Sequence, residues 1–144
     1  MDEDELRRTV RKSLDEAFTG VSLTESGTIM VPMPDNPIGC KTARLADGSL
    51  TVNLEAPVLF DVPAPSAVLY ELICVLSNNL GYGSFVVIGG PNGDIHIFLR
   101  AQVPPEAAHG PAMPRAVRLL HAAALHEIQR FRSLTPPIGG TTAL

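Results

Sequence analysis

The chain has 144 residues, of which 45% are hydrophobic and 18% are charged, and its formal net charge is −4. This length and composition are typical of one folded domain and not of a disordered chain. The negative net charge supplies no positive field that would gather phosphate backbones, so we expect no nucleic-acid partner.

The chain opens with a pattern that predicts a surface helix over residues 3–18. Leu6, Val10, Leu14 and Phe18 recur at helical spacing, and charged residues cover the rest of the surface. The first eight residues, "MDEDELRR", are acidic and contain no apolar stretch, which argues against a signal peptide.

Residues 22–62 change to the two-residue period of strands. The pattern predicts a strand over 28–33 and a hairpin of 41–45 with 49–54 through "ADG", and the apolar run continues to Phe60. Pro32, Pro34 and Pro37 each lack a backbone donor, so we expect the 28–33 strand at an edge of the sheet.

A second helix is predicted over residues 66–80. Its apolar side chains cover about 160° of arc, wider than the ~100° stripe that an ordinary surface helix needs. This width suggests a contact with a second copy of the chain, and the candidate residues are Val68, Leu72, Val75 and Leu76. The apolar region is interrupted by polar residues well short of the ~20 residues of a membrane span, so we expect a soluble cytoplasmic protein.

The glycine-rich stretch from Gly89 to Asp94 separates two runs, 85–88 and 95–99, that are rich in β-branched and aromatic residues. A Walker-type phosphate loop needs Lys and Ser/Thr after its second glycine, and Asp94 and Ile95 follow here instead. We therefore expect a hairpin turn without a ligand role. Gly93 is the residue expected to take a positive φ.

The third predicted helix covers residues 113–132, with an apolar stripe on one side and a basic face on the other. The remaining residues, "SLTPPIGGTTAL", have the composition of a frayed tail. The expected organisation is one domain over 1–132 and a flexible C-terminal tail over 133–144.

The sequence contains no recognisable catalytic or metal-binding motif. His126-Glu127 begins like a zinc-protease pattern, but the fourth residue after His126 is Arg130 and no second imidazole follows. No Gly-x-Ser-x-Gly motif occurs, and His96 has no Cys, Asp or Glu at ligand spacing. We expect Cys40 and Cys74 to be unpaired thiols, buried as small hydrophobic side chains, in a reducing cytoplasm. We expect neither enzyme activity nor a cofactor or metal.

The predicted order is helix, three strands, helix, two strands, helix. With "LSNNLGYGSF" after the second helix and "NGDIHIFLRAQVP" as the last strand, it resembles the type III secretion chaperone-like fold. Specialised secretion chaperones and the YbjN-like bacterial proteins called sensory transduction regulators share this fold. The resemblance covers residues 3–132. It implies an α+β fold in which an antiparallel sheet packs against helices, a homodimer, and no catalysis.

The resemblance also implies where a partner protein would bind. Secretion chaperones hold an extended client segment on apolar patches of the first helix and first strands. The matching positions in this chain are Leu6, Val10, Leu14, Phe18, Ile29, Val31 and Met33. The proline-rich "VPMPDNPIGC" departs from the pattern and shortens the strand that would receive the client.

Two hypotheses about function follow. The first is a non-catalytic protein-binding module, chaperone-like or regulatory, that acts as a homodimer on a segment of a partner protein. The second is a small-molecule sensor or enzyme with a pocket between sheet and helices, using His96, Arg100 or Tyr70. A bound metabolite would favour the second hypothesis, and co-purification of a specific protein would favour the first.

Overall fold

A computed structural model describes residues 1–63 and 67–143, and omits the side chains of residues 134–138. Its helices are α1 (Glu3–Ala17), α2 (Ala67–Ser77), the short 3-10 helix η1 (Pro105–Ala107) and α3 (Ala112–Ile138). Its strands are β1 (Ser22–Leu23), β2 (Ile29–Val31), β3 (Ile38–Arg44), β4 (Leu50–Val62), β5 (Ser84–Gly89), β6 (Ile95–Val103) and β7 (Thr141–Thr142).

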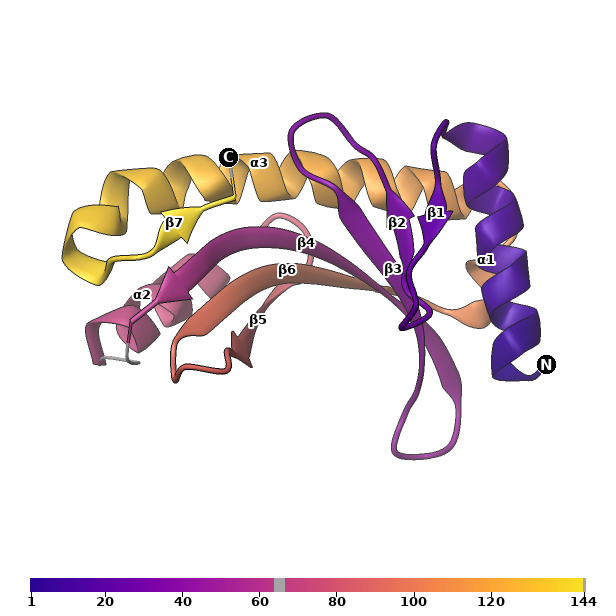
Figure 1. Cartoon of the computed structure of the whole chain (residues 1–144), viewed down its shortest axis with the longest axis horizontal. Helices are drawn as coiled ribbons and strands as arrows, with labels where there is room; N and C mark the ends of the chain where they lie inside the picture. The colour runs from indigo at the N-terminus through magenta and orange to yellow at the C-terminus, as the bar shows by residue number, and fades with distance from the viewer. Residues whose placement is uncertain (64–66, 144) are drawn as a thin grey trace.

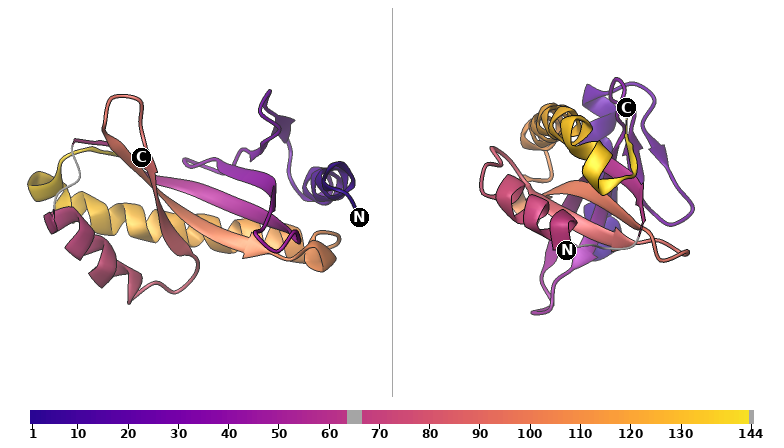
Figure 2. Two further views of the ribbon diagram at one scale, coloured as in Figure 1. Left: turned by 90° about the horizontal axis from the view of Figure 1, so that it is seen from below. Right: turned by 90° about the vertical axis from the view of Figure 1, so that its left-hand side faces the viewer.

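The seven strands form one antiparallel sheet with the order β1-β2-β3-β4-β6-β5, and β7 pairs separately with β4. The helices pack against this sheet, so the fold is α+β as predicted. α1 and α2 lie at opposite ends of the molecule, and the long α3 runs between these ends (Figure 1). Two further views show α2 beside the C-terminal half of α3 (Figure 2).

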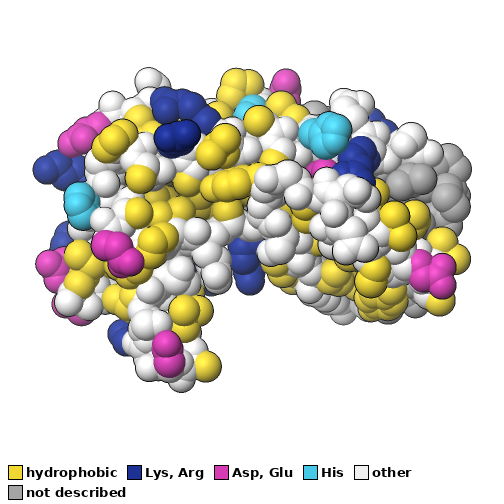
Figure 3. Space-filling model, turned by 180° about the vertical axis from the view of Figure 1, so that it is seen from behind, with side chains coloured by type: hydrophobic (Ala, Val, Ile, Leu, Met, Phe, Trp, Pro, Cys, Tyr) yellow, Lys and Arg dark blue, Asp and Glu magenta, His cyan; other side chains and the backbone are white. Residues whose placement is uncertain are grey.

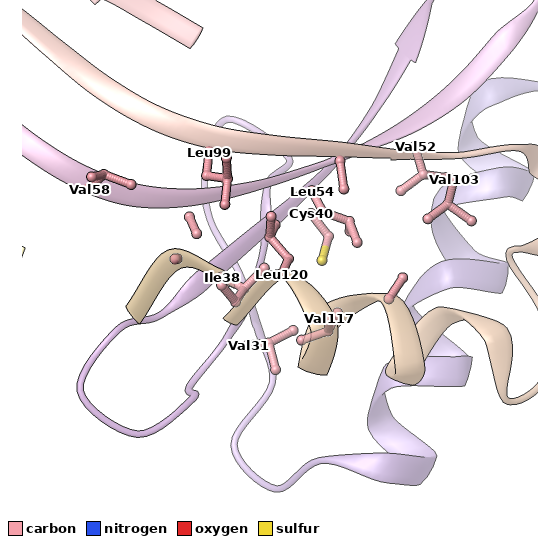
Figure 4. Packing of buried hydrophobic residues seen from close by; sticks show 14 of the residues in the cluster. Val31, Ile38, Cys40, Val52, Leu54, Val58, Leu99, Val103, Val117 and Leu120 are labelled. Carbon is pink, nitrogen blue, oxygen red and sulfur yellow. The ribbon is translucent and has the colours of Figure 1, made fainter. Parts of the chain in front are cut away.

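The core lies between the sheet and α3. Along β6 every second residue is buried, from Ile95 to Val103, as expected for a strand with one face on the core. Leu120 of α3 points toward Cys40 and Leu54 of the sheet, and Val117 lies beside Val31 (Figure 4). The buried face of the sheet, to which β6 contributes every second residue, therefore packs against the apolar stripe that the sequence predicts for α3.

Helix α1 forms as its sequence predicts. Asp2 caps it by accepting a hydrogen bond from the Glu5 N–H at 2.7 Å, and the helix ends at Ala17. Its apolar stripe is buried against β3 and α3. Ser13 extends this contact by donating a hydrogen bond to the carbonyl of Ala108, and the Arg118 guanidinium lies 4.9 Å from the centre of the Phe18 ring.

Three differences from the sequence prediction concern strands. The predicted 28–33 strand is shorter, because β2 ends at Val31, and it is not at the edge, because β1 pairs with its outer side. The predicted 49–54 strand is longer, since β4 continues to Val62. Irregular register after Pro57 bends β4 while it stays paired with β6.

The end of the chain also differs from the expected flexible tail. Helix α3 continues to Ile138, and β7 then returns to pair with Leu59 and Phe60 of β4. Helix α2 is shorter than predicted, ending at Ser77, and the predicted first residue, Ser66, lies outside the described residues. Among the helices described, none is long and apolar enough to cross a membrane.

Candidate functional site

An exposed apolar strip runs along α2. Val68 and Val75 are 50% and 58% exposed, and the half-buried Leu72 lies one turn from each, so the three side chains share one face of the helix. Leu76, which the sequence groups with them, is only 6% exposed and belongs to the core. The strip therefore consists of Val68, Leu72 and Val75, and we call it the α2 strip.

Strand β5 lies next to α2 and forms an edge of the sheet. Among the described residues β5 pairs only with β6. Val87, opposite Ile97, is 38% exposed on the face of the sheet that packs against the helices. Because the Gly90 N–H bonds to the Asp94 carbonyl, alternation along the antiparallel pair turns the N–H and C=O groups of Phe85, Val87 and Gly89 away from β6. These outward groups form a short edge that can accept another strand.

Apolar side chains gather in two zones of the surface seen from behind (Figure 3). One zone is at the lower right, where α2 lies, and the second is hollowed next to α3. The hollow next to α3 has a volume of about 370 Å³ and is lined by Tyr82, Pro111, Ala112, Arg115, Ala116 and Leu119. Partial burial raises the pKa of the Tyr82 phenol above its usual value.

The positions that the resemblance assigns to a partner are mostly inside the molecule. Five of them have an exposed fraction of 0–1%: Leu6, Val10, Leu14, Ile29 and Val31. Phe18 and Met33 are half-buried and pack against the rim of the core. In the single chain, the five buried side chains fill the space between α1 and the sheet, so a partner reaches only Phe18 and Met33 without moving α1.

The glycine-rich stretch forms the predicted hairpin turn between β5 and β6. The Gly90 N–H donates to the Asp94 carbonyl at 2.7 Å and closes the loop. Gly93 has a φ of +79°, which confirms the expected positive value.

A cluster that sequence spacing does not reveal lies at the base of this hairpin. Asp61, Asp94 and His96 each place a donor atom within 4.8 Å of the others. The backbone N–H of Asp61 donates to Nδ1 of His96 at 3.1 Å, so a neutral ring carries its proton on Nε2. Nδ1 uses its lone pair to accept this hydrogen bond, and Nε2 carries the proton. In this arrangement the imidazole therefore offers no free lone pair to a metal ion.

The residues of the sensor or enzyme hypothesis do not converge. Arg100 pairs with Glu55 across β4 and β6, with Nε 3.0 Å from Oε1, and His96 bonds to Asp61 on the same face. Tyr70 lies exposed on α2, and no described contact or hollow joins it to either residue. The pocket predicted between sheet and helices is therefore not built from these three side chains.

The two cysteines occupy different environments. Cys40 is buried in β3, and desolvation raises the pKa of its thiol to about 12, whereas Cys74 is exposed on α2. The two thiols are free and lie in separate elements. Cys74 is the thiol that reagents in solution can reach.

Comparison with known proteins gives a structural likeness but no match by sequence. No family model matches the chain, and no curated protein matches it. The fold is similar to a chain in the crystal structure of the ExsC–ExsE complex, with 16% sequence identity and a TM-score of 0.49. The match covers 93% of this chain and 96% of the other.

Proposed function

We propose that this chain is a non-catalytic protein-binding module, chaperone-like or regulatory, that acts as a homodimer on a segment of a partner protein. We place it in the cytoplasm, where free thiols such as those of Cys40 and Cys74 stay reduced.

The observation that carries the proposal is the concentration of exposed apolar side chains on two neighbouring elements. Nine large hydrophobic residues are exposed in the described part of the chain, and five of them lie on α2 and β5: Val68, Tyr70, Val75, Val87 and Ile88. Single exposed hydrophobics are ordinary, but a cluster beside an open strand edge is typical of a surface that contacts another chain.

A two-fold contact through the α2 strip uses each residue twice. Full burial of a valine is worth about 1.5–3 kcal/mol, and since Val68 and Val75 are already about half buried, each contributes about 1 kcal/mol per copy. The two valines of both copies then contribute about 4 kcal/mol before the cost of association, which is a large enough share to make the dimer sensitive to one substitution.

The test is the mass in solution of the wild-type chain and of Val75→Glu, measured by light scattering coupled to size exclusion. We expect the wild type at twice the chain mass of 15.3 kDa and Val75→Glu as a monomer. Leu45→Glu is the matched control, because Leu45 is also exposed, at 42%, but lies in the turn between β3 and β4. A wild type that stays monomeric at every concentration contradicts the dimer.

Partner binding is tested separately, at Met33. Because Met33 is half-buried at the rim of the core, Met33→Glu leaves the fold intact and should reduce the amount of partner protein that co-purifies from the native host. Ile29→Glu is the contrasting variant, since Ile29 is 1% exposed and a buried charge there unfolds the chain. Unchanged co-purification with Met33→Glu argues against this face as the partner site.

A further inference from the structure

The outer edge of β4 is covered by two different segments of the chain. Strand β3 pairs with β4 from Leu50 to Glu55. Beyond that point β7 takes over: Thr142 lies opposite Leu59, Thr141 lies opposite Phe60, and the Ala143 N–H donates to the Val58 carbonyl at 3.0 Å. The last residues of the chain therefore occupy an edge that β3 leaves open.

The attachment of β7 is short. It has two residue pairs with β4, whereas β6 has eight on the opposite edge, and Thr141 is exposed while Thr142 and Ala143 are half-buried. A side-chain hydrogen bond from Arg132 to Thr142 ties it to α3 at 3.3 Å. Ala143 packs against the core, but β7 brings few other buried apolar contacts. Segments of this kind open at low free-energy cost, so we expect β7 to detach more easily than the longer strands.

The edge also selects what can bind there. Gly140 has a φ of +88°, and a Cβ on it would lie 2.9 Å from the Phe60 carbonyl oxygen and 3.0 Å from Cγ2 of Val62. Only glycine fits both the backbone conformation and the space. The residues that follow are threonines, which are small enough for the edge and favour extended backbone.

We propose that the β4 edge from Val58 to Phe60 is a strand-accepting site for an extended segment of a partner protein, with a glycine followed by small β-branched residues. Strand β7 occupies this site in cis and competes with the partner. This inference rests on the proposed function only for the premise that the partner is a protein segment. The β4 edge is separate from the α2 strip and from the open edge of β5. A tethered tail competes at an effective concentration in the millimolar range, so it acts as a gate on partner binding.

The experiment releases the tail in the full-length chain. Gly140→Val should expel β7, because its side chain meets Phe60 and Val62. Gly48→Val is the matched control, with a φ of +87° and no atom within 4 Å of the added Cβ. The probe is the peptide acetyl-Gly-Gly-Thr-Thr-Ala-amide, and the readout is the NMR shifts of the Val58, Leu59 and Phe60 amides. A second peptide carries valine in place of the second glycine.

We expect saturable shifts in Gly140→Val, with an apparent affinity at least tenfold higher than in the wild type or Gly48→Val, and none with the valine peptide. Ala143→Pro, which removes the N–H that bonds to Val58, should release the tail by a second route if Gly140→Val does not fold.

Three results overturn the proposal. In the first, the tail is released but neither peptide shifts these amides. In the second, β7 stays docked in Gly140→Val. In the third, a wild-type dimer disappears on Gly140→Val while the α2 strip is intact, which identifies the occupant as the tail of a second copy. Loss of peptide binding with the α2-strip dimer retained leaves the proposed function standing, so the two failures are distinguishable.

Discussion

Two glycines with the same backbone conformation and different surroundings allow backbone strain to be separated from steric strain. Gly93, in the β5–β6 turn, has a φ of +79° and no atom within 4 Å of an added Cβ. Gly83, just before β5, has a φ of +80°, but its added Cβ would lie 2.7 Å from the Arg100 carbonyl oxygen and 3.3 Å from Cγ of Leu99. Alanine at either position therefore has the same backbone strain but meets different neighbours.

The expected magnitudes follow from these distances. A left-handed non-glycine residue costs about 1–2 kcal/mol, and this is the whole expected cost of Gly93→Ala. Gly83→Ala adds the displacement of β5 from β6, because the nearest atom belongs to the backbone and cannot rotate away. Overpacking of this kind costs about 1–3 kcal/mol more, equivalent to roughly a 5- to 150-fold larger unfolding constant.

The assay is urea unfolding of the wild type and both alanine variants, followed by circular dichroism. We expect the wild type to be the most stable and Gly83→Ala the least. Equal losses of stability in the two variants would refute the reasoning, because they would mean that β5 yields freely and that the close approach to Arg100 costs nothing. A loss below 0.3 kcal/mol in Gly93→Ala, roughly the error of such a comparison, would refute the backbone part.

Three further predictions concern the two cysteines and the ion pair between Arg130 and Glu127. A thiol reagent should modify Cys74 at once and Cys40 only on unfolding, and equal rates at the two thiols would contradict the burial of Cys40. Because burial raises the pKa of Cys40 from 9.0 to about 12, the folded chain keeps a proton that the unfolded chain loses. Stability should therefore fall by about 1.4 kcal/mol per pH unit between about pH 9 and 12, and urea titrations of Cys40→Ala should lack this component. Arg130 Nη1 lies 2.8 Å from Oε1 of the buried Glu127, whose Oε2 has no hydrogen-bond partner among the described residues. Arg130→Met should cost about 3 kcal/mol and Arg130→Met with Glu127→Met much less, and a double-mutant cycle that finds the two changes additive would refute this coupling.

Elements whose signal is local could be predicted from the sequence. Helix α1 carries its own apolar stripe and capping aspartate, and the β5–β6 turn needs a positive φ where Gly93 stands. The wide apolar arc of α2 likewise indicates a helix with more apolar surface than its core contact uses, as the exposure of Val68 and Val75 shows.

Features that depend on distant segments could not be predicted in this way. Strands β1 and β7 have two residues each, which is too few to show a period. The sequence therefore predicts neither the pairing of β1 with β2 nor that of β7 with β4. The meeting of Asp61 with His96 depends on the pairing and bend of β4 against β6. Alternation places Ile29 and Val31 on one face, but only the packing of α1 shows that this face is closed.

The contact between α1 and α3 bears on how the chain folds during synthesis. Ser13 is separated by 95 residues from its hydrogen-bond partner Ala108, which itself precedes α3, so α1 leaves the ribosome long before α3 exists. Until then only the early strands can cover the apolar stripe of α1, and the side that meets α3 stays open to water. A chain interrupted before residue 112 therefore exposes the apolar side chains of α1 to chaperones and proteases. Contacts between segments this far apart in the sequence also slow folding.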